Sequence, residues 1–327
     1  MPQPRRNFLK IVIGAAAGFS GLSAWAQSWP DKAIKLVLGY TTGGATDSTA
    51  RIIGRPLEQI IKQSVVMEYK PGAGASIGAE FVARAAPDGY TLGLTDTGPL
   101  CIMPNLRKVS YDPLTSFTPI SYVCTTGLVL IVNPELPVKN IQELIALAKA
   151  KPGQFSYASS GVGSVHHLAG ELFKVRAGLR IVHIPYRGAG PALTDLVGGQ
   201  IPIMFATIGP ALAMIAAGKA RALGVTTLTR SSSLPNVPTI AEQGLKGYEA
   251  VLRFMVMGPA KMPTAITSKL QADFKTVISD SAVVGELKKL GNDDIAYKTP
   301  SEIEAMIQDD YRKWGDLIKE LKITLDT

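Results

Sequence analysis

Short apolar runs alternate with amphipathic segments along the first part of the chain. The runs at 34–39, 65–69 and 90–95 are apolar and lie next to Gly- or Pro-containing turns, as buried strands do. The segments 46–61 and 77–85 place apolar residues at helical spacing. This strand–helix–strand–helix–strand order predicts a parallel sheet covered by helices.

The same alternation continues further along the chain. Strands are predicted at 117–124, 128–132, 155–158, 180–185, 201–205 and 221–226, and helices at 138–150, 164–175, 191–197 and 210–217. An apolar run at 250–257 then leads back towards the first unit. The segment 301–321 is predicted to be a helix that begins with a capping box of Ser301 and Glu304.

The layout indicates an α/β protein in which the chain crosses from one lobe to another and returns. Its 327 residues are more than one hydrophobic core comfortably fills. We expect residues 27–124 and 250–327 to form lobe 1 and residues 125–249 to form lobe 2. Residues 1–26 are expected to be an export signal that is absent from the mature protein.

The N-terminus has the pattern of an export signal. Arg5, Arg6 and Lys10 precede an apolar run at 11–22, and the small-x-small sequence 24–26 follows it. We expect cleavage after Ala26 and a periplasmic location. The paired arginines resemble the twin-arginine motif, although such a pair also serves the general secretory route.

Composition excludes several classes of protein. Hydrophobic residues make up 46% of the chain, which is typical of a globular protein and not of a disordered one. Three His and two Cys are too few for a Cys/His-rich metal protein or a disulfide scaffold. The net charge is +8 without a basic run, so nucleic acid is not an expected partner. Cys101 and Cys124 either form one disulfide or remain as two buried thiols.

Several predicted strands end in a loop of small residues that opens a helix. These loops lie at 40–47, 159–164, 187–191 and 206–210. A parallel sheet brings such loops to one edge, where each helix start offers free N–H groups and a partial positive charge. The loops therefore predict a cleft that binds a carboxylate or phosphate. The alternative is that the small residues only satisfy the backbone geometry of the turns.

Four other patterns have weaker functional interpretations. Asp47 is expected to accept backbone N–H groups and brace its loop. The Gly-rich segment 72–78 resembles a dinucleotide fingerprint but lacks the partner acid, so no nucleotide is expected. His167 and Glu171 share a helix face but make too few ligands for a metal site. Ser164 with His167 is the basis of an alternative function, an exported hydrolase.

Arg253 is the only charged residue within the apolar run at 250–260. A charge placed there needs a partner, because burial of an unpaired charge is costly. The partner is either an acidic side chain in a structural ion pair or a ligand carboxylate held by the guanidinium fork.

Together these residues resemble the Bug or TctC-like family, the periplasmic solute-binding proteins of tripartite tricarboxylate transport systems. The strings that carry the resemblance are Gly43-Gly44-Ala45-Thr46-Asp47, Pro71-Gly72-Ala73-Gly74, Ala86-Pro87-Asp88-Gly89-Tyr90, Tyr111-Asp112-Pro113, His167-Leu168-Ala169-Gly170-Glu171, Pro185-Tyr186-Arg187-Gly188 and Pro235-Asn236-Val237-Pro238-Thr239. The resemblance implies a two-lobed, Venus-flytrap α/β fold of type II with crossover strands as its hinge. It implies no cofactor and no metal.

The resemblance also implies where the ligand carboxylate is held. The expected ligand-binding residues are Tyr40, Thr41, Thr42, Gly43, Gly44, Ala45, Thr46, Asp47, Thr95, Thr97, Ser159, Ser160, Gly163, Ser164, His166, Ala206, Thr207 and Arg253. Ala206 and Thr207 stand where relatives often carry Asp and Asn. The missing acid argues against amino-acid ligands, because an ammonium group would lack its partner.

Arg253 and His166 stand where relatives often carry an aromatic and a small residue. We therefore expect a dicarboxylate or an aromatic carboxylate, with one carboxylate on the helix termini of both lobes and the other on Arg253 or His166. Tyr40, Phe205 and Phe254 are expected to form an apolar wall. The expected protein is a monomer without enzymatic activity that delivers its ligand to a membrane transporter. A ligand-binding component of a sensor system is the remaining alternative.

Overall fold

The computed structural model describes residues 29–324, so the expected export signal lies outside the described residues. The strands are β1 (Ile34–Leu38), β2 (Val65–Tyr69), β3 (Thr91–Thr95), β4 (Phe117–Val132), β5 (Ser156–Ser159), β6 (Val182–Pro185), β7 (Ile203–Thr207), β8 (Arg221–Val225), β9 (Val251–Pro259) and β10 (Asn292–Asp293). The helices are α1 (Ala45–Ile61), α2 (Ser76–Ala83), α3 (Met103–Leu106), α4 (Ile141–Ala150), α5 (Val165–Ala177), α6 (Ala189–Val197), α7 (Ile208–Ala216), α8 (Thr264–Ser279), α9 (Ser281–Lys289) and α10 (Pro300–Leu321). Two short turns of helix, η1 (Ala73–Ala75) and η2 (Gly98–Ile102), precede α2 and α3.

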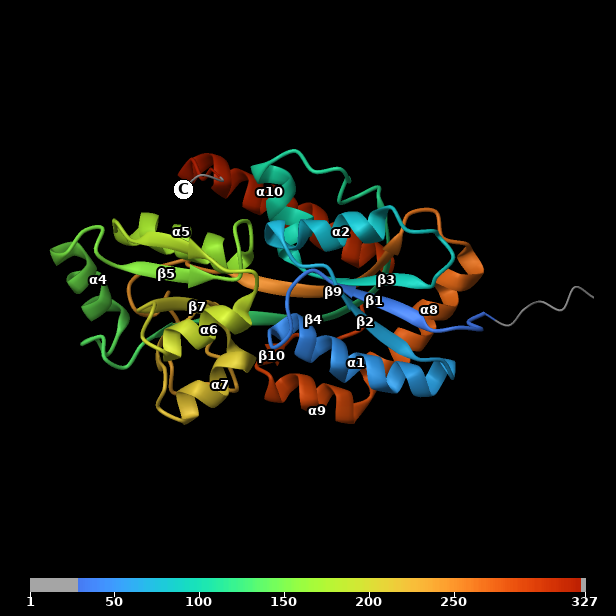
Figure 1. Ribbon diagram of the computed structural model, residues 1–327, viewed down its shortest axis with the longest axis horizontal. Coiled ribbons are helices and arrows are strands. Elements are labelled where there is room, and N and C mark those ends of the chain that lie inside the picture. Colours follow the sequence, from blue (N-terminus) through green and yellow to red (C-terminus); the bar gives the residue numbers. More distant parts are fainter. Residues whose placement is uncertain (1–28, 325–327) are drawn as a thin grey trace, which may run out of the picture.

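The strands join in one curled sheet with helices on both of its faces (Figure 1). The order along it is β2-β1-β3-β9-β4-β7-β5-β6, and β8 and β10 also pair with β4. We call the strands β1 to β3 with their covering helices unit 1, and β5 to β8 with α4 to α7 unit 2. Whether the lobe boundaries lie where the sequence places them stays a prediction.

Unit 1 forms as its sequence pattern predicts. β1 pairs in parallel with β2 and with β3, which gives the expected strand–helix alternation. Helix α1 buries Ile53, Leu57 and Ile61, which recur at helical spacing on the face that packs on the core. In Figure 1, α1 and α9 lie below this part of the sheet, α2 lies above it, and α8 is seen at its right-hand end.

The two strands predicted at 117–124 and 128–132 are in fact one strand, β4, of 16 residues. Its first part pairs antiparallel with β9, from Phe117 opposite Pro259 to Gly127 opposite Val251. Its last part, from Leu128, pairs with β7 and β8 in unit 2. The Thr-Thr-Gly sequence that suggested a break is compatible with extended backbone, because threonine favours strands.

Unit 2 repeats the parallel arrangement. β5 pairs in parallel with β6 and with β7. A second apolar cluster, which includes Ala192, Leu196, Met204 and Ile208, fills the space between α6, α7 and the sheet. Figure 1 shows α5 above this part of the sheet and α6 and α7 below it.

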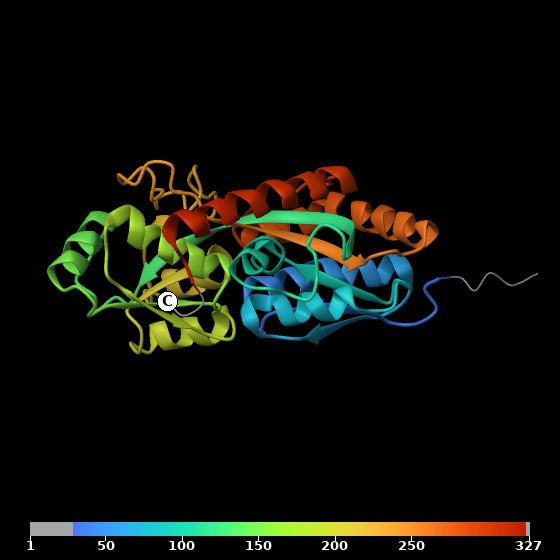
Figure 2. The same ribbon diagram turned by 90° about the horizontal axis from the view of Figure 1, so that it is seen from above.

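Helix α10 lies along both units (Figure 2). It contacts η2, α3 and β4, and it also contacts α5 of unit 2. Its capping box is formed by Thr299 and Glu302 and not by Ser301 and Glu304. The helix begins one residue earlier than predicted, and its cap lies two residues earlier, because Pro300 occupies the first helical position, where proline is favoured.

Both cysteines are buried thiols in this structure, and they form no disulfide. Cys101 donates a hydrogen bond to the carbonyl of Ile307 at 3.6 Å. Burial raises the pKa of the Cys101 and Cys124 thiols above the usual range. The alternative of two buried thiols is therefore the one observed.

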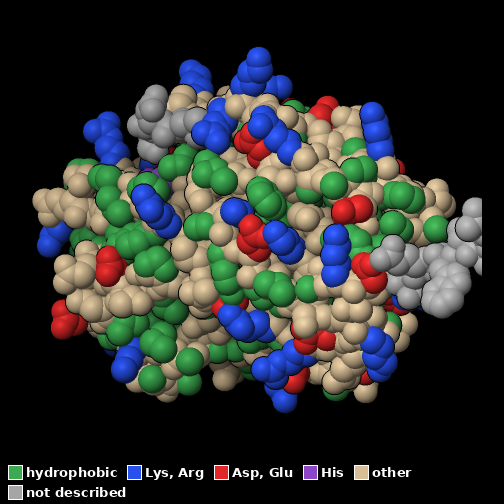
Figure 3. All heavy atoms as spheres, turned by 45° about the vertical axis from the view of Figure 1, so that its right-hand side comes forward, with side chains coloured by type: hydrophobic (Ala, Val, Ile, Leu, Met, Phe, Trp, Pro, Cys, Tyr) green, Lys and Arg blue, Asp and Glu red, His purple; other side chains and the backbone are tan. Residues whose placement is uncertain are grey.

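Charged side chains are distributed over the surface. On the face shown in Figure 3, Lys and Arg are interspersed with Asp and Glu and are not gathered in one patch. Within residues 29–324, no helix has the length and apolar character needed to cross a membrane.

The capping residue of α10 can be tested directly. Replacement of Thr299 by Ala should lower the free energy of unfolding by about 1 kcal/mol, because the backbone N–H of Glu302 loses its acceptor. Chemical denaturation measures the change. Ser301→Ala is the matched control and should cost much less. Equal losses for both variants would contradict the assignment of Thr299 as the cap.

Candidate functional site

The loops after β1, β5 and β7 and the start of α6 meet around one buried cavity. It is lined by Tyr40, Gly44, Ala45, Thr46, Ser160, His166, Ala189, Thr207, Leu252 and Phe254. The volume of this cavity is about 20 Å3, enough for about one water molecule. Both units contribute to it, so its size depends on how closely they approach.

Three helices begin at this cavity without a side chain that caps them. Helix α1 has Gly44 at its N-cap and α6 has Gly188, and neither residue has a side chain that could accept from the first N–H groups. Thr207 is the N-cap of α7, but its hydroxyl makes no capping bond. Helix α5 differs, because Ser164 accepts a hydrogen bond from the backbone N–H of His167. The uncapped N-termini of α1, α6 and α7 thus supply free donors and positive potential to one place.

Several side-chain atoms near the cavity are buried and without a hydrogen-bond partner among the described residues. They are Oγ1 of Thr41, Nε2 of His166 and Oγ1 of Thr207. Nδ1 of His166 lies 2.8 Å from the hydroxyl oxygen of Ser160, which fixes the orientation of the ring. Burial lowers the pKa of His166 to about 4, so its imidazole is neutral at neutral pH. A buried polar atom without a partner is costly, and a ligand that binds here can provide that partner.

Asp47 braces the first loop, as its position predicts. Its carboxylate accepts hydrogen bonds from the N–H of Gly43 at 3.1 Å, from Nε of Arg51 at 3.0 Å and from the hydroxyl of Tyr69 at 2.7 Å. These donors hold the turn between β1 and α1. A direct contact of Asp47 with ligand stays a prediction.

Tyr40 connects the cavity to a buried acid. Its hydroxyl donates to Oδ1 of Asp96 at 3.4 Å, and the N–H of Gly98 donates to the same oxygen at 2.7 Å. Oδ2 of Asp96 has no partner among the described residues. Burial raises the pKa of Asp96 to about 7, despite the two hydrogen bonds that lower it. Sequence analysis did not identify this residue as part of the site, although it lies between the expected residues Thr95 and Thr97.

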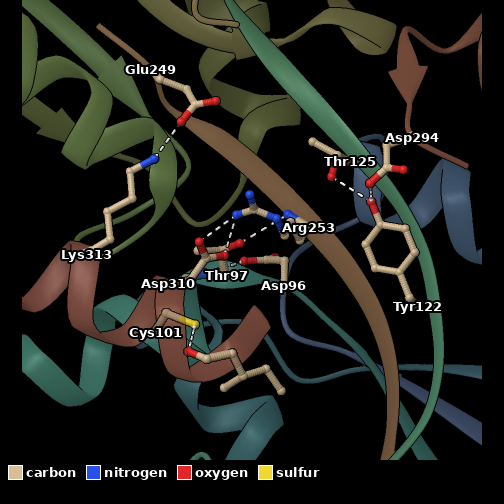
Figure 4. Close-up of polar contacts among 12 residues, drawn as sticks. Asp96, Thr97, Cys101, Tyr122, Thr125, Glu249, Arg253, Asp294, Asp310 and Lys313 are labelled. Carbon is tan, nitrogen blue, oxygen red and sulfur yellow. Dashed lines mark hydrogen bonds and ion pairs between the residues drawn. The ribbon is translucent and has the colours of Figure 1, made fainter. Parts of the chain in front are cut away.

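The structure places Arg253 in an ion pair and not at the wall of this cavity. Leu252 and Phe254 line the cavity, whereas Arg253 lies between them on β9 and points to the opposite face of the strand. Its Nη1 lies 2.6 Å from Oδ1 of Asp310 on α10, and its backbone N–H donates to Thr97 (Figure 4). Arg253 is therefore in a structural ion pair, the alternative left open by the sequence, and it does not face the cavity.

The other expected residues divide into two groups. The structure brings Tyr40, Gly44, Ala45, Thr46, Ser160, His166 and Thr207 to the cavity wall. The expected residues that do not line it are Thr41, Thr42, Gly43, Asp47, Thr95, Thr97, Ser159, Gly163, Ser164, Ala206 and Arg253. Phe205 is not a wall residue either, since its ring packs on Tyr157 and Phe173 in the core. Phe254, which was expected in the apolar wall, does line the cavity, and the lining residues that were not expected are Ala189 and Leu252.

Ser164 and His167 are both engaged in structural contacts. The Ser164 hydroxyl donates to the carbonyl of Gly161 at 2.7 Å and caps α5. Nδ1 of His167 accepts from the N–H of Gly163, and the ring stacks on His183 at 4.1 Å. A nucleophile and its general base would be hydrogen-bonded to each other through their side chains, and the side chains of Ser164 and His167 have other partners. Within residues 29–324, no three His, Cys, Asp or Glu side chains are grouped so that they could hold a metal ion.

Glycines allow the two units to approach closely beside the cavity. A Cβ at Gly190 in α6 would lie 3.0 Å from the carbonyl oxygen of Thr42 in unit 1. A Cβ at Gly188 would lie 2.4 Å from Oγ1 of Thr41, and one at Gly74 would lie 2.4 Å from the carbonyl oxygen of Val162. The structure is therefore a closed arrangement in which backbone meets backbone across the cleft.

Comparison with known proteins places these features in a family. The family model described as "Tripartite tricarboxylate transporter family receptor" matches residues 49–323. Protein BugT of Bordetella pertussis is 34% identical over 316 residues, which cover 95% of this chain and 97% of BugT. The solved periplasmic binding protein BugD has a TM-score of 0.87 at 32% identity, over 90% of this chain and 99% of BugD. Rpa4515 of R. palustris, solved with adipate, has the same TM-score and identity over the same shares of the two chains.

The matches extend through most of the chain and confirm the resemblance that the sequence strings carry. They also confirm the predicted fold class, an α/β periplasmic binding protein with strands that cross between its two parts. The chain therefore belongs to the family of tripartite tricarboxylate transporter receptors, whose members are periplasmic solute-binding proteins.

Proposed function

We propose that this protein captures a small organic carboxylate between unit 1 and unit 2 and delivers it to a membrane transporter of the tripartite tricarboxylate type. The observation that carries the proposal is the convergence of the uncapped N-termini of α1, α6 and α7 on one buried cavity. Such a group of donors suits an anion without any cationic side chain. Binding is the whole function, and the ligand leaves chemically unchanged.

The ligand class follows from the cavity wall. No acidic side chain lines the cavity, so an ammonium group would find no counter-charge there. Tyr40, Leu252 and Phe254 provide an apolar surface beside the donors. A dicarboxylate or an aromatic carboxylate has an anionic end that suits the donors and an apolar body that suits this surface. The adipate bound by Rpa4515 supports the same class, since adipate is a linear dicarboxylate.

His166 adds one donor of defined geometry. When the Ser160 hydroxyl donates to Nδ1 of His166, the ring proton is on Nε2, which is the nitrogen without a partner. Nε2 then donates to the ligand carboxylate, while the low pKa of the imidazole keeps it neutral. In this proposal His166 orients the carboxylate, and the helix termini supply most of its electrostatic stabilisation.

Capture requires the two units to separate. The closed cavity is too small for a dicarboxylate, so the ligand must enter an open form. The strands β4 and β9 continue between the units and are the expected hinge. Closure then brings the donors of α6 and α7 onto a ligand held by α1. The N-terminal export signal and delivery from the periplasm complete the proposal.

The ligand class is tested by thermal unfolding of residues 27–327 with a panel of carboxylates, amino acids and neutral sugars. At a hundred times its dissociation constant, a ligand stabilises the folded state by about 2.7 kcal/mol. Dicarboxylates or aromatic carboxylates should raise the midpoint, and the ligand should be recovered unchanged. A response to amino acids alone would contradict the proposed class, and turnover of the ligand would favour the hydrolase alternative.

Closure is tested at Gly190. A side chain there meets the Thr42 carbonyl only when the units are closed, so Gly190→Val should weaken carboxylate binding roughly tenfold through overpacking. Calorimetry measures the affinity, and denaturation checks that the fold is retained. Gly285→Val in α9 is the control, because a Cβ at Gly285 has no heavy atom within 4 Å. Unchanged affinity in Gly190→Val would rule out closure onto the ligand.

The buried acid predicts a pH dependence of binding. Asp96 loses its proton as the pH rises through about 7, which places a negative charge next to Tyr40 in the cavity wall. Affinity for a carboxylate should therefore fall, by roughly five- to tenfold, between pH 6 and pH 8.5. His166 stays neutral over this range, and burial keeps Tyr40 protonated by raising its pKa. Asp96→Asn should remove the dependence, and an equally steep profile in this variant would assign it to another group.

A further inference from the structure

A groove much larger than the buried cavity adjoins it. Its volume is about 530 Å3, and it is lined by Tyr40, Pro71, Gly72, Ala73, Gly74, Ala75, Ile77, Ser160, Gly161, Val162, Pro185, Tyr186 and Arg187. Tyr40 and Ser160 belong to the walls of both hollows. The groove therefore continues from the cavity towards solvent, between the 71–77 segment of unit 1 and the 185–187 segment of unit 2.

The groove has one charged side chain among its lining residues, Arg187, and no acid. Arg187 is exposed, and its guanidinium makes no hydrogen bond or ion pair within residues 29–324. Other arginines of the chain are engaged, such as Arg253 with Asp310 and Arg221 with the carbonyl of Val138. The acid nearby in sequence, Asp195, accepts a hydrogen bond from the hydroxyl of Tyr186. Arg187 is thus a cation whose fork of donors is free at the rim of the groove.

The backbone holds Arg187 at this position. The next residue, Gly188, has a φ of 151°, and a side chain there would collide with Thr41 of the first loop. Tyr186 donates its backbone N–H to the carbonyl of Ser159, which ties the same segment to the end of β5. The Arg187 backbone is therefore fixed beside the first loop when the two units are closed, while its side chain keeps its own freedom.

We propose that this groove is a second subsite, in which Arg187 binds the far carboxylate of an elongated dicarboxylate whose near carboxylate occupies the buried cavity. The inference rests on the proposed function and specifies its substrate class further. Pro71, Ile77 and Val162 provide apolar surface for a methylene chain between the two ends. The planar guanidinium matches a carboxylate with two parallel hydrogen bonds. Arg187 takes the role that the sequence had suggested for Arg253.

The test compares dicarboxylates with monocarboxylates of the same length. Calorimetry would measure the dissociation constants of two pairs of ligands, adipate with hexanoate and pimelate with heptanoate. The measurements would be made for the wild type, for Arg187→Gln and for Arg187→Lys. Wild-type protein should bind the dicarboxylates more tightly. Arg187→Gln should lose about tenfold or more of the dicarboxylate affinity, and its monocarboxylate affinity should not change. Arg187→Lys should retain part of the preference, because the charge remains but the fork is lost.

Arg180→Gln is the matched control. Arg180 is also an exposed arginine of unit 2, but it does not line the groove. This variant should bind every ligand as the wild type does. If Arg187→Gln lowers the affinity for dicarboxylates and monocarboxylates equally, or alters neither affinity, the proposal of a second subsite is wrong and the proposed function stands. If the wild type binds no carboxylate of either type, the proposed function fails and the subsite fails with it.

Discussion

The antiparallel pairing of β4 with β9 is the constraint on which the rest of the structure depends. β4 pairs with β9 along unit 1 and then continues as a strand of unit 2. One ladder of backbone hydrogen bonds therefore connects the parallel strands of unit 1 to those of unit 2 within the sheet. This connection places the loops at the carboxyl ends of β1, β5 and β7 on facing sides of the two units. The cavity is a consequence of that geometry and of the small residues in the loops.

Stability and binding make opposite demands on the helix N-termini in this site. Helix α5 has its own cap, Ser164, and its start is satisfied within the chain. Helices α1, α6 and α7 begin with donors that no side chain satisfies, which is unfavourable for a buried helix end. The unpaired atoms of His166 and Thr207 add to the same cost. In the proposed function, a ligand that accepts hydrogen bonds from these donors would stabilise the closed form more than the open one, and this difference would drive closure.

Much of the fold and part of the site could be predicted from the sequence, for identifiable reasons. Residues such as Gly44, Ser160 and Thr207 follow strands of a parallel sheet, and the order of elements alone brings strand ends together. Arg253 faces away from the cavity because side chains alternate along β9 and its neighbours Leu252 and Phe254 line the cavity. A shift of one residue along a strand exchanges the side chains that face the cavity for those that face away from it. Asp96 was missed because its importance comes from burial and from the contact with Tyr40, which no local pattern shows. The start of α10 was misplaced because Ser301 and Thr299 both suit a cap, and Pro300 decides between them.

The glycines where unit 1 and unit 2 touch beside the cavity affect which mutations the site can accept. Gly74, Gly188 and Gly190 let backbone meet backbone across the cleft, so the fit of the closed form does not depend on the side chains that touch the ligand. The cavity wall at Tyr40, Leu252 and Phe254 lies beside this surface and not within it. Mutations can therefore reshape the wall while the two units still close in the same way. Related proteins with this architecture could therefore differ in the ligand that they bind while they keep the same contact surface between the two units.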